Sequence, residues 1–128
     1  MIGLVVVGFD ILPEAILVAL QCMTGKQKQI CAVSISIDED VKAQRQAILE
    51  AISSVDEGAG VLVFTDSAAA PAGLIMMSII DKENIQVLHG VNLTMLCKVV
   101  EQREYLELED LAKLARDEGR KGISWLSP

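Results

Sequence analysis

The sequence predicts an α/β fold with an open, mostly parallel four-stranded sheet that carries helices on both faces. Short apolar runs alternate along the chain with longer segments whose apolar residues recur at helical spacing. Hydrophobic residues make up 52% of the chain, which suits a sheet that is covered on both sides. Because 128 residues form a domain of ordinary size and no linker or repeat interrupts the pattern, we expect one domain over residues 1–128.

Four runs have the composition of buried parallel strands. They are rich in valine, isoleucine and leucine and lack the polar alternation of a half-exposed strand. The predicted strands are Ile2–Val7, Ile30–Ile37, Val61–Phe64 and Ile85–Leu88. Since strands that alternate with helices form right-handed βαβ units, these runs specify a single parallel sheet.

Four other segments have apolar residues at the spacing of an amphipathic helix. Gly25 follows the first as a plausible C-terminal cap, Asn92 precedes the third as a good N-cap, and Gly119 follows the fourth. The predicted helical segments are Leu12–Met23, Val41–Val55, Leu93–Val100 and Leu108–Ala115.

The composition excludes several function classes. A net charge of −7 and a pI near 4.6 argue against binding to nucleic acid or to anionic membranes. The longest uncharged stretch, Ser67–Ile80, is too short to span a bilayer, and the N-terminus lacks the features of a secretory signal. We therefore expect a cytoplasmic protein. Cys22, Cys31 and Cys97 lack metal-ligand spacing and are expected to be free, buried thiols.

Several motifs spread over the chain resemble one protein family, the mannose-type enzyme IIA domain of the bacterial sugar phosphotransferase system. The opening Met1–Val7 and the segment Val61–Asp66 resemble the first and third strands of that family. Gly90–Leu96 is close to its Gly-Val-Asn-Leu-Pro-Met-Leu motif, and Arg116–Ile123 resembles its ending. The resemblance implies that phosphotransferase-system proteins, namely HPr and a IIB protein, are partners.

The first strand-to-helix junction departs from the family. In an open α/β sheet, ligands collect at such junctions. The family carries its phosphate-accepting histidine there in a Ser/Thr-His-Gly turn, whereas this chain has Gly8-Phe9-Asp10. A phenyl ring cannot accept a phosphoryl group, so the resemblance implies that Phe9 has replaced the acceptor. The chain would then be a IIA homologue that has lost the family's phosphotransferase activity.

The residues after the third strand also depart from the family. The resemblance matches Asp66 to the aspartate that orients the histidine, although Asp66 could equally be an N-cap or turn aspartate. The family continues with Asp-Leu-Phe-Gly-Gly-Thr/Ser-Pro, but here Ser67–Pro71 is one residue shorter and has no glycine. Since alanine is strained where φ is positive, we expect this loop to take another path.

Two alternative phosphate acceptors remain. His89, the only histidine, ends the fourth predicted strand and could be a displaced acceptor, or a partly exposed histidine that is hydrogen-bonded near a turn. Asp10 and Asp66 could instead form an acidic pair that binds a divalent cation or accepts phosphate. Receiver domains that use such a pair also need a lysine after a fifth strand, and no equivalent is found.

Two function classes follow from these observations. One is a binding or regulatory module that docks phosphotransferase-system proteins without carrying phosphate, and the other is a phosphocarrier that uses His89, Asp10 or Asp66. Neither requires a cofactor or a metal ion. Because family members exchange a short C-terminal strand between subunits, the apolar tail around Trp125 implies a homodimer.

Overall fold

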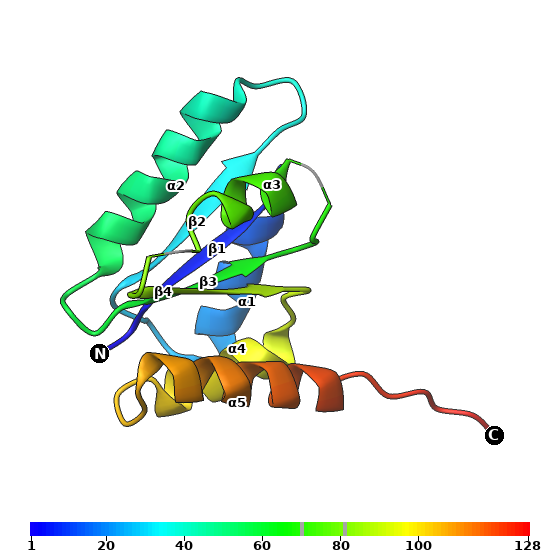
Figure 1. The fold of residues 1–128 in the computed structure, drawn as a ribbon. Coiled ribbons are helices and arrows are strands. Elements are labelled where there is room, and N and C mark those ends of the chain that lie inside the picture. Colours follow the sequence, from blue (N-terminus) through cyan, green and yellow to red (C-terminus); the bar gives the residue numbers. More distant parts are fainter. Residues whose placement is uncertain (70, 81) are drawn as a thin grey trace.

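The computed structural model describes residues 1–69, 71–80 and 82–128, and it has the predicted α/β architecture (Figure 1). Strands and helices alternate along most of the chain, and the last two elements are both helices. In order, the elements are β1 (Gly3–Phe9), α1 (Leu12–Thr24), β2 (Ile30–Ile35), α2 (Val41–Val55), β3 (Val61–Thr65), α3 (Ala72–Met77), β4 (Ile85–His89), α4 (Leu93–Gln102) and α5 (Leu108–Lys121).

The four strands form one parallel sheet in the order β2-β1-β3-β4. In register, Val7 of β1 lies opposite Thr65 of β3, and Thr65 lies opposite His89 of β4. The carboxyl ends of these three strands therefore share one edge of the sheet, which we call the carboxyl edge. The crevice outside such an edge is where ligands bind in open α/β sheets.

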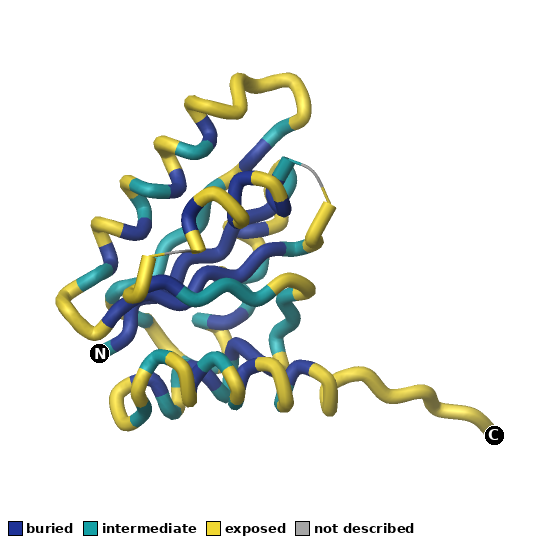
Figure 2. Tube along the Cα trace, viewed as in Figure 1, coloured by how far each residue is buried: buried dark blue, intermediate teal, exposed yellow. Residues whose placement is uncertain are grey.

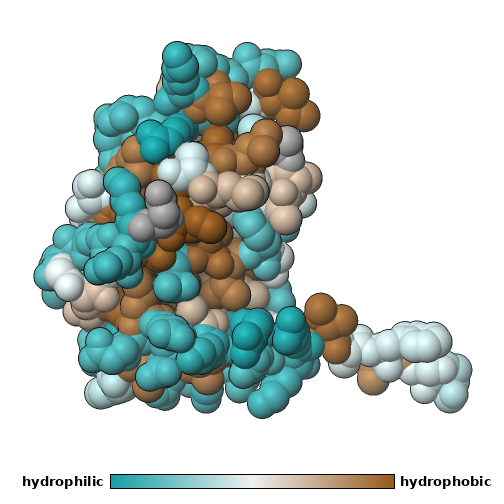
Figure 3. All heavy atoms as spheres, in the orientation of Figure 1, coloured by the Kyte–Doolittle hydropathy of each residue, from teal (hydrophilic) through white to brown (hydrophobic). Residues whose placement is uncertain are grey.

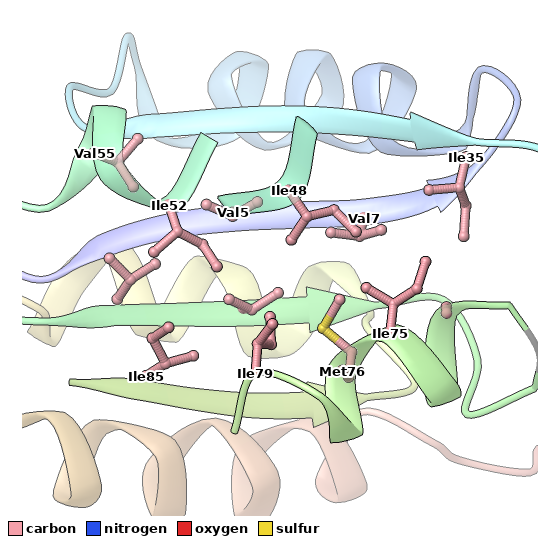
Figure 4. Packing of buried hydrophobic residues seen from close by; sticks show 13 residues of the cluster. Val5, Val7, Ile35, Ile48, Ile52, Val55, Ile75, Met76, Ile79 and Ile85 are labelled. Carbon is pink, nitrogen blue, oxygen red and sulfur yellow. The ribbon is translucent and has the colours of Figure 1, made fainter. Parts of the chain in front are cut away.

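Helices cover both faces of the sheet, as the composition predicted (Figures 1 and 2). Helices α2 and α3 lie on one face, and Figure 4 shows how their apolar side chains meet those of the strands. The buried residues of this face are Val5, Val7, Ile35, Ile48, Ile52, Val55, Val61, Val63, Ala72, Ile75, Met76, Ile79 and Ile85. Successive strand residues point to opposite faces, so the odd-numbered valines of β1 belong here.

Helices α1, α4 and α5 cover the opposite face. The buried residues on this side are Ile2, Leu4, Val6, Leu17, Leu20, Leu62, Phe64, Met95, Leu96, Val99, Leu111 and Ala115. Leu4 and Val6 alternate with Val5 and Val7 along β1, which explains why that strand is apolar throughout. None of the helices in the described ranges has the length and apolar character needed to cross a bilayer.

The Gly-Val-Asn motif and the end of α5 meet on this second face. The Asn92 side chain caps α4 by accepting a hydrogen bond from Met95 N at 3.0 Å, and its Nδ2 donates to Gly119 O at 3.1 Å. Gly119 does not end α5, as its position in the sequence suggested, but lies buried within it. A Cβ at Gly119 would collide with the Met95 side chain, so glycine lets α5 approach α4 closely.

Arg103 follows α4 and is the largest fully buried side chain, with 1% of its surface exposed. Its Nη1 donates to the carbonyl oxygens of Ile2 and Gln29, at 3.3 and 3.2 Å. Its Nη2 donates to Lys28 O at 2.6 Å and to Gln27 Oε1 at 3.1 Å. Burial lowers the pKa of Arg103. The guanidinium thus joins the start of β1 to the segment that leads into β2.

Three further features of local structure differ from what the sequence predicted. Helix α3 was not predicted, because its sequence, Ala72–Met77, is short and uncharged and shows no polar face. Ile37 was placed in the second strand, but it lies beyond β2 and is 79% exposed. The three cysteines are free as predicted, but Cys22 is exposed and the other two are only half-buried.

The C-terminal tail, residues 123–128, has no regular secondary structure in the single chain and extends away from the body of the molecule (Figures 1 and 2). Ile123, Trp125 and Leu126 are 80%, 92% and 93% exposed. The expected C-terminal strand is therefore not formed within one subunit. Its exchange between two subunits stays a prediction.

Candidate functional site

The junction between β1 and α1 is held closed by the carboxylate of Asp66, the residue that follows β3. Asp66 Oδ2 accepts a hydrogen bond from Phe9 N at 3.1 Å, and Asp66 N donates to Val7 O at 3.3 Å. Oδ2 would also lie 3.4 Å from a Cβ at Gly8. The structure therefore brings the turn Gly8-Phe9-Asp10 and Asp66 together, and Asp66 makes the backbone contact of a turn aspartate.

The second carboxylate oxygen of Asp66 differs from the first in its hydrogen bonding. Oδ1 is buried and has no hydrogen-bond partner among the described residues. A buried acceptor without a donor costs free energy, so native structures rarely contain one without a reason. The carboxylate is thus already oriented toward the turn and keeps one oxygen unused.

Asp10 has the left-handed backbone that this turn requires. Its φ is +53°, a conformation that aspartate tolerates better than most residues other than glycine. Ser34 Oγ donates to Asp10 O at 2.7 Å and contacts the Glu14 carboxylate at 2.9 Å. Neither Ser34 nor Glu14 was predicted to belong to the site, since the contact depends on β2 lying beside β1.

His89 lies at the end of β4 with its ring next to Thr65. His89 Nδ1 is 2.6 Å from Thr65 Oγ1, and that hydroxyl also donates to Ser67 O at 3.0 Å. With the hydroxyl proton directed to Ser67, Nδ1 is the donor in this contact, and Nε2 takes no part in it. Thr65 was not predicted as a site residue, although a polar residue at the end of an apolar strand could have indicated that it belongs to the site.

The structure places His89 and the turn at Phe9 on the same edge of the sheet but in different hollows. Phe9 and Asp10 line a shallow cavity of about 280 Å³ with residues 35–38. His89 lines two others, of about 260 and 300 Å³. Because β3 separates β1 from β4, the two strands are about 10 Å apart.

The two residues of the acidic pair considered from the sequence lie in different surroundings. Asp66 Oδ2 accepts a hydrogen bond from the backbone N–H of Phe9, whereas Asp10 is exposed. Across the described ranges, no group of three or more histidine, cysteine, aspartate or glutamate side chains is arranged to hold a metal ion.

The loop after Asp66 is described except for Ala70, so part of the predicted change of path lies outside the described residues. Ser67 Oγ accepts a hydrogen bond from Ala69 N at 3.1 Å. The non-glycine residues with positive φ in the described chain are Asp10 and Gln29, and neither lies in this loop. Its described alanines are therefore not strained.

The family model described as the PTS system fructose IIA component matches residues 3–115. The chain belongs to this family. The match includes β1, the turn at Phe9, Asp66 and the Gly-Val-Asn motif, so the family assignment made from the sequence is confirmed. A search of curated proteins found no match.

Solved structures of IIA proteins have the same fold. The phosphotransferase system component EIIA from Streptococcus agalactiae is 23% identical with a TM-score of 0.86, and the match covers 97% of this chain and 96% of that one. The mannose/sorbose specific IIA subunit from Enterococcus faecalis is 20% identical with a TM-score of 0.77, covering 99% and 96%. The PTS IIA protein associated with the fucose utilization operon of Streptococcus pneumoniae is 14% identical with a TM-score of 0.76, covering 90% and 88%. At these identities the likeness concerns the fold alone.

Proposed function

We propose that this IIA-family protein is a cytoplasmic binding or regulatory module that docks phosphotransferase-system proteins without carrying phosphate at the β1–α1 turn. The observation that carries the proposal is the contact between Asp66 Oδ2 and the backbone N–H of Phe9. The carboxylate is oriented toward a residue whose phenyl ring has no nucleophilic atom. The turn is kept, while the group that would accept phosphate is absent from it.

Exposed apolar residues at the carboxyl edge support a docking role. Ile11 follows β1 and is 73% exposed, and Ile37 follows β2 and is 79% exposed. Ile37 lines the cavity with Phe9 and Asp10, and Ile11 directly follows Asp10 in the chain. Because the chain carries a net charge of −7, a basic partner is favoured. HPr and a IIB protein are the partners that the family implies.

Intact-mass measurement tests the loss of phosphate transfer. The protein is incubated with phosphoenolpyruvate, enzyme I and HPr, and an enzyme IIA that keeps the family histidine serves as the positive control. We expect the control to gain one phosphate and this protein to gain none. Stoichiometric phosphorylation of the wild-type chain would contradict the proposal.

Binding measurements test the docking surface. We expect Ile11→Asp to weaken binding of HPr or IIB, because it places a charge in the apolar contact area. Val18→Asp is the matched control, since Val18 is 62% exposed on the outer side of α1 and is absent from the Phe9 cavity. Equal effects of the two variants, or no binding of wild type at about 1 mM partner, would place the function elsewhere.

One specific observation favours a second candidate function, a phosphocarrier that uses His89. The contact with Thr65 Oγ1 orients the ring and leaves Nε2 free on an exposed residue. In this case the protein gains one phosphate from phospho-HPr, and His89→Ala abolishes the gain. Label that survives His89→Ala and hydrolyses like an acyl phosphate would instead assign the acceptor to Asp10 or Asp66.

We also propose that the protein is a homodimer in which the tail of one copy pairs with β4 of the other. Strand β4 is an edge strand, and beside it lies a groove of about 260 Å³ that is lined largely by Met76, Met77, Ile80, Ile85 and Val87. Figure 3 shows a hydrophobic area over α3 and β4, and hydrophobic atoms on the extended tail. An exposed edge and an exposed apolar tail complement each other.

Sedimentation measurements test the dimer. Deleting residues 123–128 leaves Gly122 as the end of α5 and should yield a monomer or an aggregate. The point variant Trp125→Asp should weaken the dimer, whereas Tyr105→Asp, at an aromatic residue that is 76% exposed far from the tail in sequence, should not. A wild-type monomer at micromolar concentration, or an unchanged dimer after the deletion, would contradict this interface.

A further inference from the structure

A cavity of about 300 Å³ lies where the end of β4, the start of α4 and the end of α5 meet. Its polar side chains come from two segments that are separated in the sequence, His89 and Asn92 from residues 89–92 and Arg116 and Arg120 from α5. The rest of its lining is glycine and apolar side chains. Sites for small molecules are typically concave and mostly apolar with a few convergent polar groups.

The charges in this cavity have the opposite sign from the chain as a whole. The protein carries a net charge of −7, yet the residues that line the cavity include two arginines and no carboxylate. Arg116 and Arg120 are separated by one helical turn of α5, so they share a side of that helix. A small anion would therefore meet two permanent positive charges at once.

Both arginines are available to a ligand. Arg120 has no carboxylate within 4.0 Å in the described part of the chain. Arg116 contacts Asp117 at 3.0 Å, but both side chains are about half exposed, and such surface pairs are weak. His89 contacts Thr65 through Nδ1, so Nε2 remains for a third polar contact.

The walls of the cavity are held in place by contacts that involve neither the two arginines nor His89. Asn92 Oδ1 accepts a hydrogen bond from Met95 N, and Asn92 Nδ2 donates one to Gly119 O. A Cβ on Gly122 would lie 2.7 Å from Thr94 Cβ, so the end of α5 is packed directly on the first turn of α4. The arginines therefore project from a helix whose position is fixed.

We propose that this cavity binds the phosphate group of a small phosphate monoester. A phosphate dianion balances the two guanidinium charges, and the planar guanidinium donates paired hydrogen bonds to phosphate oxygens. A carboxylate carries only one charge and leaves one arginine uncompensated. The proposal concerns reversible binding, and it is independent of whether any residue accepts a phosphoryl group.

The test is a titration with inorganic phosphate and with glycerol 3-phosphate, followed by the backbone amide signals of Gly90, Gly119 and Arg120 in NMR spectra. We expect saturable shifts at these amides, and binding at least about tenfold weaker in Arg116→Gln and in Arg120→Gln, which each remove charge-assisted hydrogen bonds. Lys121→Gln is the matched control. It removes the same charge from the same end of α5 at a residue that does not line the cavity.

Several outcomes overturn the proposal. Equal weakening by Lys121→Gln would mean that phosphate responds only to overall charge. If Arg120→Gln unfolds at the same temperature as wild type and binds phosphate with the same affinity, this cavity is not the phosphate site. Acetate binding as tightly as phosphate would replace the phosphate assignment with a carboxylate one. No phosphotransferase-system protein is present in these titrations, so their result does not depend on the proposed docking function.

Discussion

Replacing Arg103 with methionine tests the largest buried polar contact of the fold. Methionine preserves much of the side-chain volume but has no donor for the four oxygens that the guanidinium contacts. Hydrogen bonds from a charged donor contribute about 1.5–3 kcal/mol each to stability. Removing the guanidinium from water costs several kcal/mol, so the net stabilisation is smaller than the sum of these hydrogen bonds. The lowered pKa of Arg103 reflects this desolvation cost. We expect the free energy of unfolding to fall by about 3 kcal/mol.

Urea denaturation at neutral pH measures this difference, and thermal unfolding should show a midpoint lower by about 10 °C for a chain of this length. Arg45→Met is the control. Within the described ranges Arg45 makes one side-chain hydrogen bond, to Ser78 Oγ at 3.0 Å, and its replacement should cost less than about 1 kcal/mol. If Arg103→Met is as stable as wild type, desolvation of the guanidinium outweighs its hydrogen bonds, and the reasoning is wrong.

Three further predictions concern the strands, a turn and the site. Gly3→Ala should lower the free energy of unfolding by about 2–3 kcal/mol in denaturation experiments, because its Cβ would collide with the Val55 backbone, which cannot move aside; an unchanged midpoint would refute this. The pKa of Asp56 is lowered from 3.8, first by the N–H of Gly58, so its stabilising contribution is present above pH 3.8 and lost as the pH falls through the lower folded value. The stability difference between wild type and Asp56→Ala should therefore shrink in acid, and a constant difference would exclude this contribution. Phe9→His alone should not restore phosphate transfer in the mass assay, since the predicted change in the loop after Asp66 also removes donors to the phosphoryl oxygens; robust transfer would show that the loop is competent.

Particular residues show how far the sequence could predict the site. The β-branched runs located β1 and β3, so the meeting of the Phe9 turn with Asp66 followed from the rule that parallel strands end at one edge. The contact between Thr65 and His89 required the strand order, because it joins neighbours in space that are 24 residues apart. The same holds for Ser34, which supports Asp10 only because β2 lies beside β1.

Helix α3 and the arginine cavity mark the limit of sequence patterns. Residues 72–77 form a helix whose inner side packs on the sheet, but their composition contains no polar face from which the helical period could be read. Arg116 and Arg120 have helical spacing in the sequence, yet nothing in that spacing indicates that His89 lines the same hollow.

The sequence by itself determined the α/β class, the parallel strands, the family and the unusual turn at Phe9, because these depend on local composition and on contiguous motifs. Only the tertiary structure decided which oxygen of Asp66 is used, which nitrogen of His89 is free and which charges share a cavity. These properties arise from strand order and helix packing, which bring together atoms that no sequence spacing relates.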